Sequence, residues 1–151
     1  MSAPSRTFDE IYLHINWHCL RDMPLIIDHL ELPLYEFVRE YCHKNRGIQC
    51  LGIGGTPTHI QLVVRVAPSL CPSEFIGKVK GASSHEMNVR TRRIAIQWQR
   101  GYGVVSFAKK NLAAVLRYVE NQKLHHQQGT TNPVLENAGD VSEEEVPGEH
   151  S

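Results

Sequence analysis

The 151-residue sequence lacks several features that would narrow its function at once. Its four cysteines (Cys19, Cys42, Cys50 and Cys71) show no C-x-x-C spacing, so a zinc site built from them is not expected. No apolar run approaches the roughly 20 residues that span a bilayer, and the polar N-terminus does not resemble a signal peptide. These absences predict a cytoplasmic protein with reduced thiols and no membrane partner.

Basic residues are absent from the C-terminal part of the chain. From residue 129 onward there are six acidic residues and no Lys or Arg. All 16 basic residues therefore lie in 1–128 with the other ten acids, which gives that part a formal charge of about +6. We predict a single domain over 1–128 and a disordered acidic tail over 129–151. A basic body suits a phosphate-bearing partner, although a mildly basic soluble domain would have the same charge.

The glycine-rich stretch 52–55 lacks the Gly-Lys-Ser/Thr ending and the following helix of a phosphate-binding loop. We interpret 52–57 as a turn between two strands. The first strand begins at Ile48, and the second covers 58–66, where apolar and polar residues alternate as in a half-buried strand.

Apolar periodicity predicts the other elements. Their order is strand, helix, strand, strand, helix, strand, helix. This order predicts an α+β ferredoxin-like sandwich, an antiparallel four-stranded sheet with helices on one face plus a C-terminal helix. The remaining predicted elements are a strand over 11–18, a helix that opens at Pro33 and stops at Gly47, a helix over 72–88, a strand over 104–107, and a last helix after Asn111.

Polar side chains occupy the second face of the strands. His59 and Gln61 lie two residues apart and project together, spaced to share one metal ion. His14 and His18 are four residues apart on their strand, over ~13 Å at ~3.3 Å per residue, which is too far to share an ion. We interpret these two histidines as facing solvent or substrate, and we expect the polar face of the sheet to be open.

Tyr118 and Gln122 lie one helical turn apart on the flank of the last apolar stripe and face roughly the same direction. Taken alone, Tyr118 is better explained as an ordinary tyrosine on the flank of a helix, and the paired Gln122 and the upstream strand are what favour a catalytic role. Tyr102 is a rival nucleophile, but it precedes a strand in a segment that is better interpreted as structural.

A basic segment accompanies and follows the second predicted helix. Such a segment is either a solvated surface or a contact for a nucleic-acid backbone, and the sequence alone favours neither. The candidate DNA-binding residues are Lys78, Lys80, Arg90, Arg92 and Arg93.

Four segments within 11–126 together resemble the single-tyrosine HUH transposases of the bacterial insertion-sequence 200/605 group. They are 58–64 (Thr-His-Ile-Gln-Leu-Val-Val), 75–84, 98–102 (Trp-Gln-Arg-Gly-Tyr) and 118–122 (Tyr-Val-Glu-Asn-Gln). The resemblance implies a homodimer that cleaves and rejoins single-stranded, hairpin-flanked DNA. It also implies that Tyr118 is the nucleophile, that a 5′-phosphotyrosine forms, and that Mg²⁺ or Mn²⁺ is held by His59, Gln61 and Gln122.

The sequence departs from the family pattern at three places. Gln61 replaces the second histidine, which gives a His-hydrophobe-Gln variant of the motif, and Thr58 replaces the usual aspartate. The basic stretch after the first strand is reduced to Arg21. A glutamine carbonyl can still bind Mg²⁺. Three functions therefore compete: an active transposase-like DNA strand transferase, a domesticated and non-catalytic nucleic-acid-binding module, and a structural or small-ligand domain.

Overall fold

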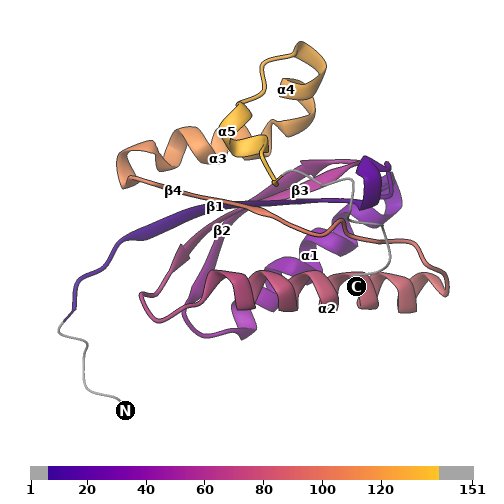
Figure 1. Ribbon diagram of the computed structural model, residues 1–151, viewed down its shortest axis with the longest axis horizontal. Helices are drawn as coiled ribbons and strands as arrows, with labels where there is room; N and C mark the ends of the chain where they lie inside the picture. Colours follow the sequence, from indigo (N-terminus) through magenta and orange to yellow (C-terminus); the bar gives the residue numbers. More distant parts are fainter. Residues whose placement is uncertain (1–6, 140–151) are drawn as a thin grey trace.

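The computed structural model describes residues 7–139. A four-stranded antiparallel sheet in the order β2-β3-β1-β4 separates two groups of helices, α1 and α2 on one face and α3, α4 and α5 on the other (Figure 1). This arrangement confirms the predicted α+β fold. The elements are β1 (Ile11–His18), α1 (Asp28–Lys44), β2 (Ile48–Thr56), β3 (His59–Val66), α2 (Pro72–Thr91), β4 (Gly103–Phe107), α3 (Leu112–Glu120), α4 (Gln122–Gln128) and α5 (Pro133–Glu136).

The main core lies between the sheet and the helices α1 and α2. Alternate residues of the two central strands, such as Trp17 on β1 and Leu62 on β3, are fully buried there. Burying a side chain of this size contributes roughly 1.5–3 kcal/mol. Because strand side chains alternate between faces, the same two strands direct His14, Asn16, His59 and Gln61 toward α3–α5, as the sequence pattern predicted. Within 7–139, no helix is both long and apolar enough to cross a membrane.

The predicted start of the first helix at Pro33 is wrong. The helix α1 begins at Asp28, with Pro33 inside it and Leu30 buried on the same stripe as Leu34. Pro33 is the sixth residue of the helix and lacks the amide that would bond to the carbonyl of His29, so one helical hydrogen bond is missing in the second turn. Burial of Leu30 extends the apolar stripe back by one turn.

The interpretation of the glycine-rich stretch as a turn is also wrong. Residues 52–56 continue β2, and the turn to β3 is the dipeptide Pro57-Thr58. A Cβ on Gly54 would overlap the carbonyl oxygen of Val119, and one on Gly52 would come within 2.7 Å of a Leu116 methyl group. The glycines therefore let α3 lie directly on the surface of β2.

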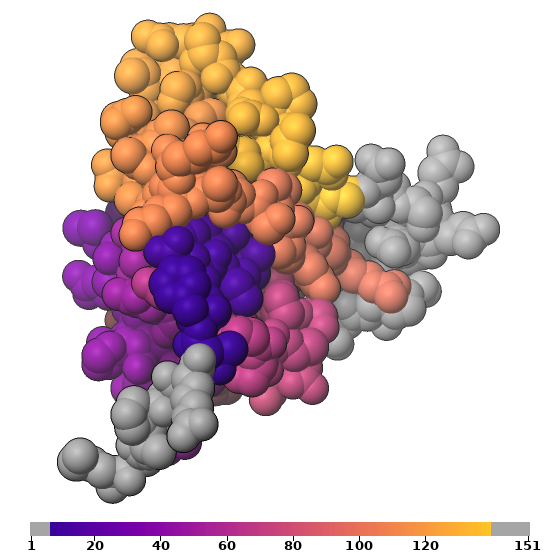
Figure 2. All heavy atoms as spheres, turned by 90° about the vertical axis from the view of Figure 1, so that its left-hand side faces the viewer, coloured from indigo at the N-terminus to yellow at the C-terminus, as the bar shows by residue number. Residues whose placement is uncertain are grey.

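The predicted open face of the sheet is covered. The helices α3, α4 and α5 form a second layer over it, seen as the orange and yellow layer in Figure 2. The last predicted helix is broken at Asn121, whose backbone leaves the helical region, so that α4 starts at Gln122. The prediction of disorder does not hold for 129–139, which includes α5, while 140–151 lie outside the described residues.

Candidate metal centre and nucleophile

His59 opens β3 and is 1% exposed. Its Nδ1 atom lies 2.9 Å from the hydroxyl of Thr56 and 3.2 Å from that of Thr58. Its Nε2 atom faces the side-chain oxygen of Gln122 at 3.0 Å. Hydroxyls at one ring nitrogen fix the orientation of the other, which is how an imidazole is prepared to bind a cation. Thr58, which replaces the family's aspartate, thus helps to position His59.

Tyr118 and Gln122 reach the same region from the break between α3 and α4. Gln122 is 1% exposed, and its amide donates to the backbone carbonyl of Tyr118 at 3.3 Å. The Tyr118 hydroxyl donates to Oε2 of Glu136 at 2.8 Å and accepts the backbone N–H of Asn132 at 2.7 Å. Of the pair expected from the Tyr-x-x-x-Gln spacing, Gln122 contacts His59 directly, and Tyr118 is connected to His59 through Glu136.

Gln61 lies beside His59, but its carbonyl oxygen points elsewhere. That oxygen accepts a hydrogen bond from Nε2 of His14 at 2.9 Å, and the Gln61 amide donates to Oε2 of Glu136 at 2.5 Å. The amide nitrogen, rather than the carbonyl oxygen, therefore faces His59, at 3.4 Å from its Nε2 atom. His14 is fully buried, so its interpretation as facing solvent or substrate is wrong, and burial lowers its pKa.

Glu136 on α5 and His126 on α4 complete the cluster, and neither was expected from the sequence. Oε1 of Glu136 lies 2.6 Å from Nε2 of His126 and 3.3 Å from Nε2 of His59. Burial alone would raise the pKa of Glu136, but hydrogen bonds from His59, Gln61 and Tyr118 outweigh it and lower the pKa to about 2. Glu136 is therefore an anion at neutral pH.

Glu136 was missed because acidic composition was interpreted as disorder. One local signal could have found its helix. Asn132 followed by Pro133 is a helix start, because asparagine caps the first amides and proline fits the first turn. In the structure the Asn132 side chain accepts from the backbone N–H groups of Val134 and Leu135.

The Tyr118 hydroxyl is held in its protonated form. Burial raises its pKa, and the carboxylate of Glu136 raises it further, against an opposing effect of the Asn132 amide. The ring also stacks on His125, with 4.7 Å between the ring centroids. Tyr118 is thus fixed in place, but it is not activated by these neighbours alone.

The donor set at the centre of the cluster suits a hard divalent cation. One ligand atom each from His59, His126 and Glu136 lie within 4.8 Å of one another. The Gln122 oxygen adds a fourth donor next to His59. Imidazole nitrogen combined with carboxylate and amide oxygen is compatible with Mg²⁺ or Mn²⁺.

The candidate DNA-binding residues are not brought to this cluster, because α2 lies on the opposite face of the sheet (Figure 1). The Lys80 ammonium donates to the carbonyls of Gln99 and Gly101 at 2.8 and 2.9 Å. Arg90 pairs with Glu86 at 2.9 Å. The remaining three of the five are exposed to solvent: Lys78 on α2, Arg92 at its C-terminal cap and Arg93 in the loop that follows.

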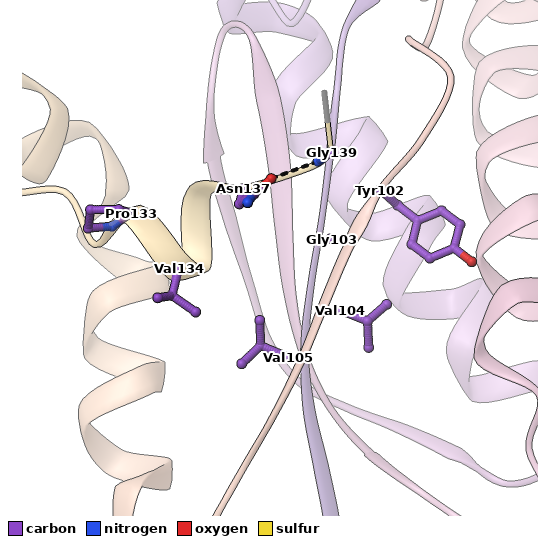
Figure 3. A pocket seen from close by; sticks show the side chains of 8 residues that line it. All are labelled: Tyr102, Gly103, Val104, Val105, Pro133, Val134, Asn137 and Gly139. Carbon is purple, nitrogen blue, oxygen red and sulfur yellow. Dashed lines mark hydrogen bonds between the residues drawn. The ribbon is translucent and has the colours of Figure 1, made fainter. Parts of the chain in front are cut away.

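A surface pocket of about 480 Å³ lies between the edge strand β4 and α5 (Figure 3). Tyr102 and Val134 are among its lining residues, and Asn137 closes one side through a 2.8 Å bond to the amide of Gly139. None of the cluster residues lines it. Tyr102 therefore belongs to a different surface from Tyr118.

Comparisons with known proteins give independent findings on the family and the fold. A model of the family described as "Transposase IS200 like" matches residues 7–122. The ISDra2 transposase TnpA of Deinococcus radiodurans is 19% identical over 119 residues, which cover 75% of this chain and 84% of the relative.

Two solved structures share the fold. A crystal structure described as that of a transposase from Deinococcus radiodurans R1 has a TM-score of 0.63 at 19% identity, covering 81% of this chain and 98% of that one. The structure of a REP-associated tyrosine transposase bound to a REP hairpin has a TM-score of 0.60 at 13% identity, with 94% of each chain covered.

Proposed function

Because the chain belongs to the family of IS200-like transposases, we propose that it cleaves and rejoins single-stranded DNA through a covalent bond to Tyr118. One observation carries the proposal. The Gln122 oxygen and the His59 imidazole, from a helix and a strand that are far apart in sequence, meet in a buried cluster, and Glu136 connects the half-buried Tyr118 hydroxyl to that cluster. A structural tyrosine on a helix flank would not require these partners.

In the proposed reaction the Tyr118 oxygen attacks a phosphorus atom of the DNA backbone. The bond from phosphorus to the 3′ oxygen breaks, the phenolic proton leaves, and the released 3′ oxygen is protonated. The products are a 5′-phosphotyrosine and a free 3′-hydroxyl, and attack by a 3′-hydroxyl reverses the step without ATP. The raised pKa of Tyr118 makes it a poor nucleophile unless the phosphate is made more electrophilic.

The chain offers a site for the cofactor that this chemistry needs. His59 and Gln122 would hold Mg²⁺ or Mn²⁺ beside Tyr118, with Gln61 next to them. A cation bound there would withdraw charge from the phosphate and orient it for in-line attack. Thr56 and Thr58 keep the His59 ring turned toward that position.

We further infer that the DNA is hairpin-flanked and that the active species is a homodimer. The REP-associated tyrosine transposase that shares this fold is bound to a REP hairpin, which supports the first inference. In the present chain Glu136 connects Tyr118 with His59 of the same protomer, which supports a reaction in cis over one in which the tyrosine serves the partner's metal site. Size-exclusion chromatography with light scattering tests the dimer.

The experiment is a covalent-capture assay with a labelled hairpin oligonucleotide that carries a single-stranded flank. The wild-type protein should give a labelled band on a denaturing gel only when Mn²⁺ or Mg²⁺ is present. Tyr118→Phe should give none while still binding the oligonucleotide, because it removes only the hydroxyl. Tyr102→Phe is the matched control, since Tyr102 lines a different surface, and it should retain the band. A band that persists in Tyr118→Phe contradicts the proposal.

A second function is favoured by two specific observations. Gln61 turns its amide nitrogen toward the cluster, and the Glu136 carboxylate already bonds to the Tyr118 hydroxyl. Both features suit a retired enzyme that only binds nucleic acid. Such a module would bind the hairpin with strong salt dependence and no metal dependence, and it would never form the covalent band.

A further inference from the structure

We propose that Glu136 and His126 are cation ligands and together replace the second histidine that this chain lacks at position 61. The inference deepens the proposed function and rests on its requirement for a divalent cation. Nε2 of His126 and Oε1 of Glu136 lie 2.6 Å apart, and that same oxygen is 3.3 Å from Nε2 of His59. The resulting site contains His59, Gln122, Glu136 and His126.

The spacing of these atoms fits one coordination shell. Mg²⁺ holds its ligands at about 2.1 Å in an octahedron, so neighbouring ligand atoms lie about 3 Å apart. The separations from His59 to Gln122, from His59 to Glu136 and from Glu136 to His126 are 3.0, 3.3 and 2.6 Å. The atoms of His59, His126 and Glu136 all lie within 4.8 Å of one another, close to the distance across such an octahedron.

Gln61 is poorly placed to serve as the missing ligand. Its carbonyl oxygen already accepts from His14, a side chain that is fully buried on β1. Turning the amide around would place the Gln61 oxygen against the Glu136 carboxylate, which would lose its donor, and the Gln61 amide nitrogen against Nε2 of His14, which would lose its acceptor. At position 61 the chain therefore has an amide that hydrogen-bonds to Glu136, in place of an imidazole that would bind the cation.

The segment that carries Glu136 is fixed to the sheet from beneath. The Asn16 side chain donates to the backbone carbonyls of Leu135 and Asn137, the residues on either side of Glu136, at 2.9 and 3.0 Å. A Cβ at Gly103 on β4 would overlap the Asn137 carbonyl, so only glycine allows this close approach. Because Leu135 is also buried, the position of Glu136 is built into the fold.

Charge favours the same assignment. His59, Gln122 and Gln61 are all neutral ligands when they bind a metal, and they would leave a buried divalent charge with no protein counter-charge. The Glu136 carboxylate supplies one negative charge and still leaves the site net positive toward a phosphate. A carboxylate is also a preferred ligand for both Mg²⁺ and Mn²⁺.

The test is a Mn²⁺ titration of the DNA-free protein in which electron paramagnetic resonance counts the free ion. The wild-type protein should bind one ion. Glu136→Gln keeps the side-chain shape and should weaken binding at least about tenfold, the lower end of what even outer-shell substitutions cause. His126→Gln changes a ligand on α4 instead of α5, and it should weaken binding as well. The exposed residues Glu120 and His85 provide matched controls, and Glu120→Gln and His85→Ala should bind Mn²⁺ as the wild type does.

Folding is checked by circular dichroism and thermal unfolding. Saturating Mn²⁺ should raise the Tm of the wild type, because a ligand that binds only the folded state stabilises it, and it should raise the Tm of Glu136→Gln less. Folded Glu136→Gln that binds Mn²⁺ within twofold of the wild type overturns the assignment. Faster DNA cleavage by that variant at unchanged Mn²⁺ affinity would identify the carboxylate as a block on the site and would also overturn it.

This outcome is separable from that of the proposed function. Wild-type protein that binds one Mn²⁺ through Glu136 but forms no covalent DNA adduct would reject the proposed chemistry and keep the ligand assignment. Covalent capture that survives in Glu136→Gln with unchanged Mn²⁺ affinity would reject the ligand assignment and keep the proposed chemistry.

Discussion

Position 61 carries an amide where the family pattern has an imidazole, and the neighbours of Gln61 show how the protein accommodates it. The Gln61 side chain connects His14 on one side with Glu136 on the other. Both of its polar ends are satisfied, which a buried amide requires. Gln61 therefore leaves no unsatisfied polar group of its own in the cluster, and its amide orients the Glu136 carboxylate.

Lys80 shows that a basic side chain on a predicted DNA-binding helix can have a structural role. Its ammonium bonds to the carbonyls of Gln99 and Gly101, so it fixes the loop before β4 to α2. Burial lowers its pKa to about 8. Lys78, two residues earlier, is exposed and suits a phosphate contact better.

We predict a stability change with pH that originates at Lys80. Between pH 8 and about 10.4, the ordinary lysine pKa, an unfolded chain keeps the Lys80 proton and the folded chain has released it. Unfolding then takes up a proton, so the free energy of unfolding should rise with pH in that window. The free energy of unfolding is measured with urea at pH 8 and pH 10 for the wild type and Lys80→Met. From pH 8 to pH 10, the value for the wild type should rise relative to the value for Lys80→Met. Lys78→Met should show no such trend, and an equal trend in both variants would contradict the assignment.

At the scale of elements, the sequence predicted the strands and helices that have a periodic apolar pattern. It did not predict the elements whose form depends on contacts between distant segments. The alternation around Trp17 and Leu62 was enough to predict the two central strands and the face they bury. The helices α4 and α5 have only one or two turns each, which is too short for a periodic apolar pattern. The sequence therefore predicted neither the break at Asn121 nor α5. Tyr118 and Gln122 could be paired from their spacing alone.

The glycines of β2 illustrate the same limit. Glycine is common in turns, so a glycine-rich stretch predicts a turn. The neighbouring sequence does not indicate that a helix packs on the strand there. Only the position of Val119 in the folded chain explains Gly54. Contacts between segments more than sixty residues apart cannot be inferred from local pattern, and the contacts of His59 with Gln122 and of His59 and Gln61 with Glu136 are of this kind.

We predict that Gly54→Ala separates α3 from β2. The added methyl group meets backbone rather than a flexible side chain, so the free energy of unfolding should fall by about 1–3 kcal/mol. Gln122 should move away from His59, and Mn²⁺ binding should weaken. Gly81→Ala on α2 is the control, because a Cβ there meets nothing within 4 Å. It should stabilise the protein by about 0.5–1 kcal/mol. Thermal or urea unfolding compares the two, and a Gly54→Ala protein as stable as the wild type would be the contrary result.

At the scale of the whole molecule, the two faces of the sheet have different roles. The face that packs on α1 and α2 is apolar and supplies most of the stability, while the face under α3–α5 contains the buried polar cluster. The described structure reaches past the family match at residue 122 to residue 139. The segment beyond the match brings His126 and Glu136 to the cluster, so the candidate site of this chain extends beyond the residues that the family model matches.

The most direct measurement of the central claim is the mass of the peptide that becomes attached to DNA. After incubation with a hairpin oligonucleotide and Mn²⁺, nuclease and trypsin digestion should leave a nucleotide on the peptide 118–123, in which Tyr118 is the only tyrosine. A nucleotide found instead on the peptide 101–109, which contains Tyr102, or on no tyrosine at all under conditions where the oligonucleotide is bound, would contradict the account.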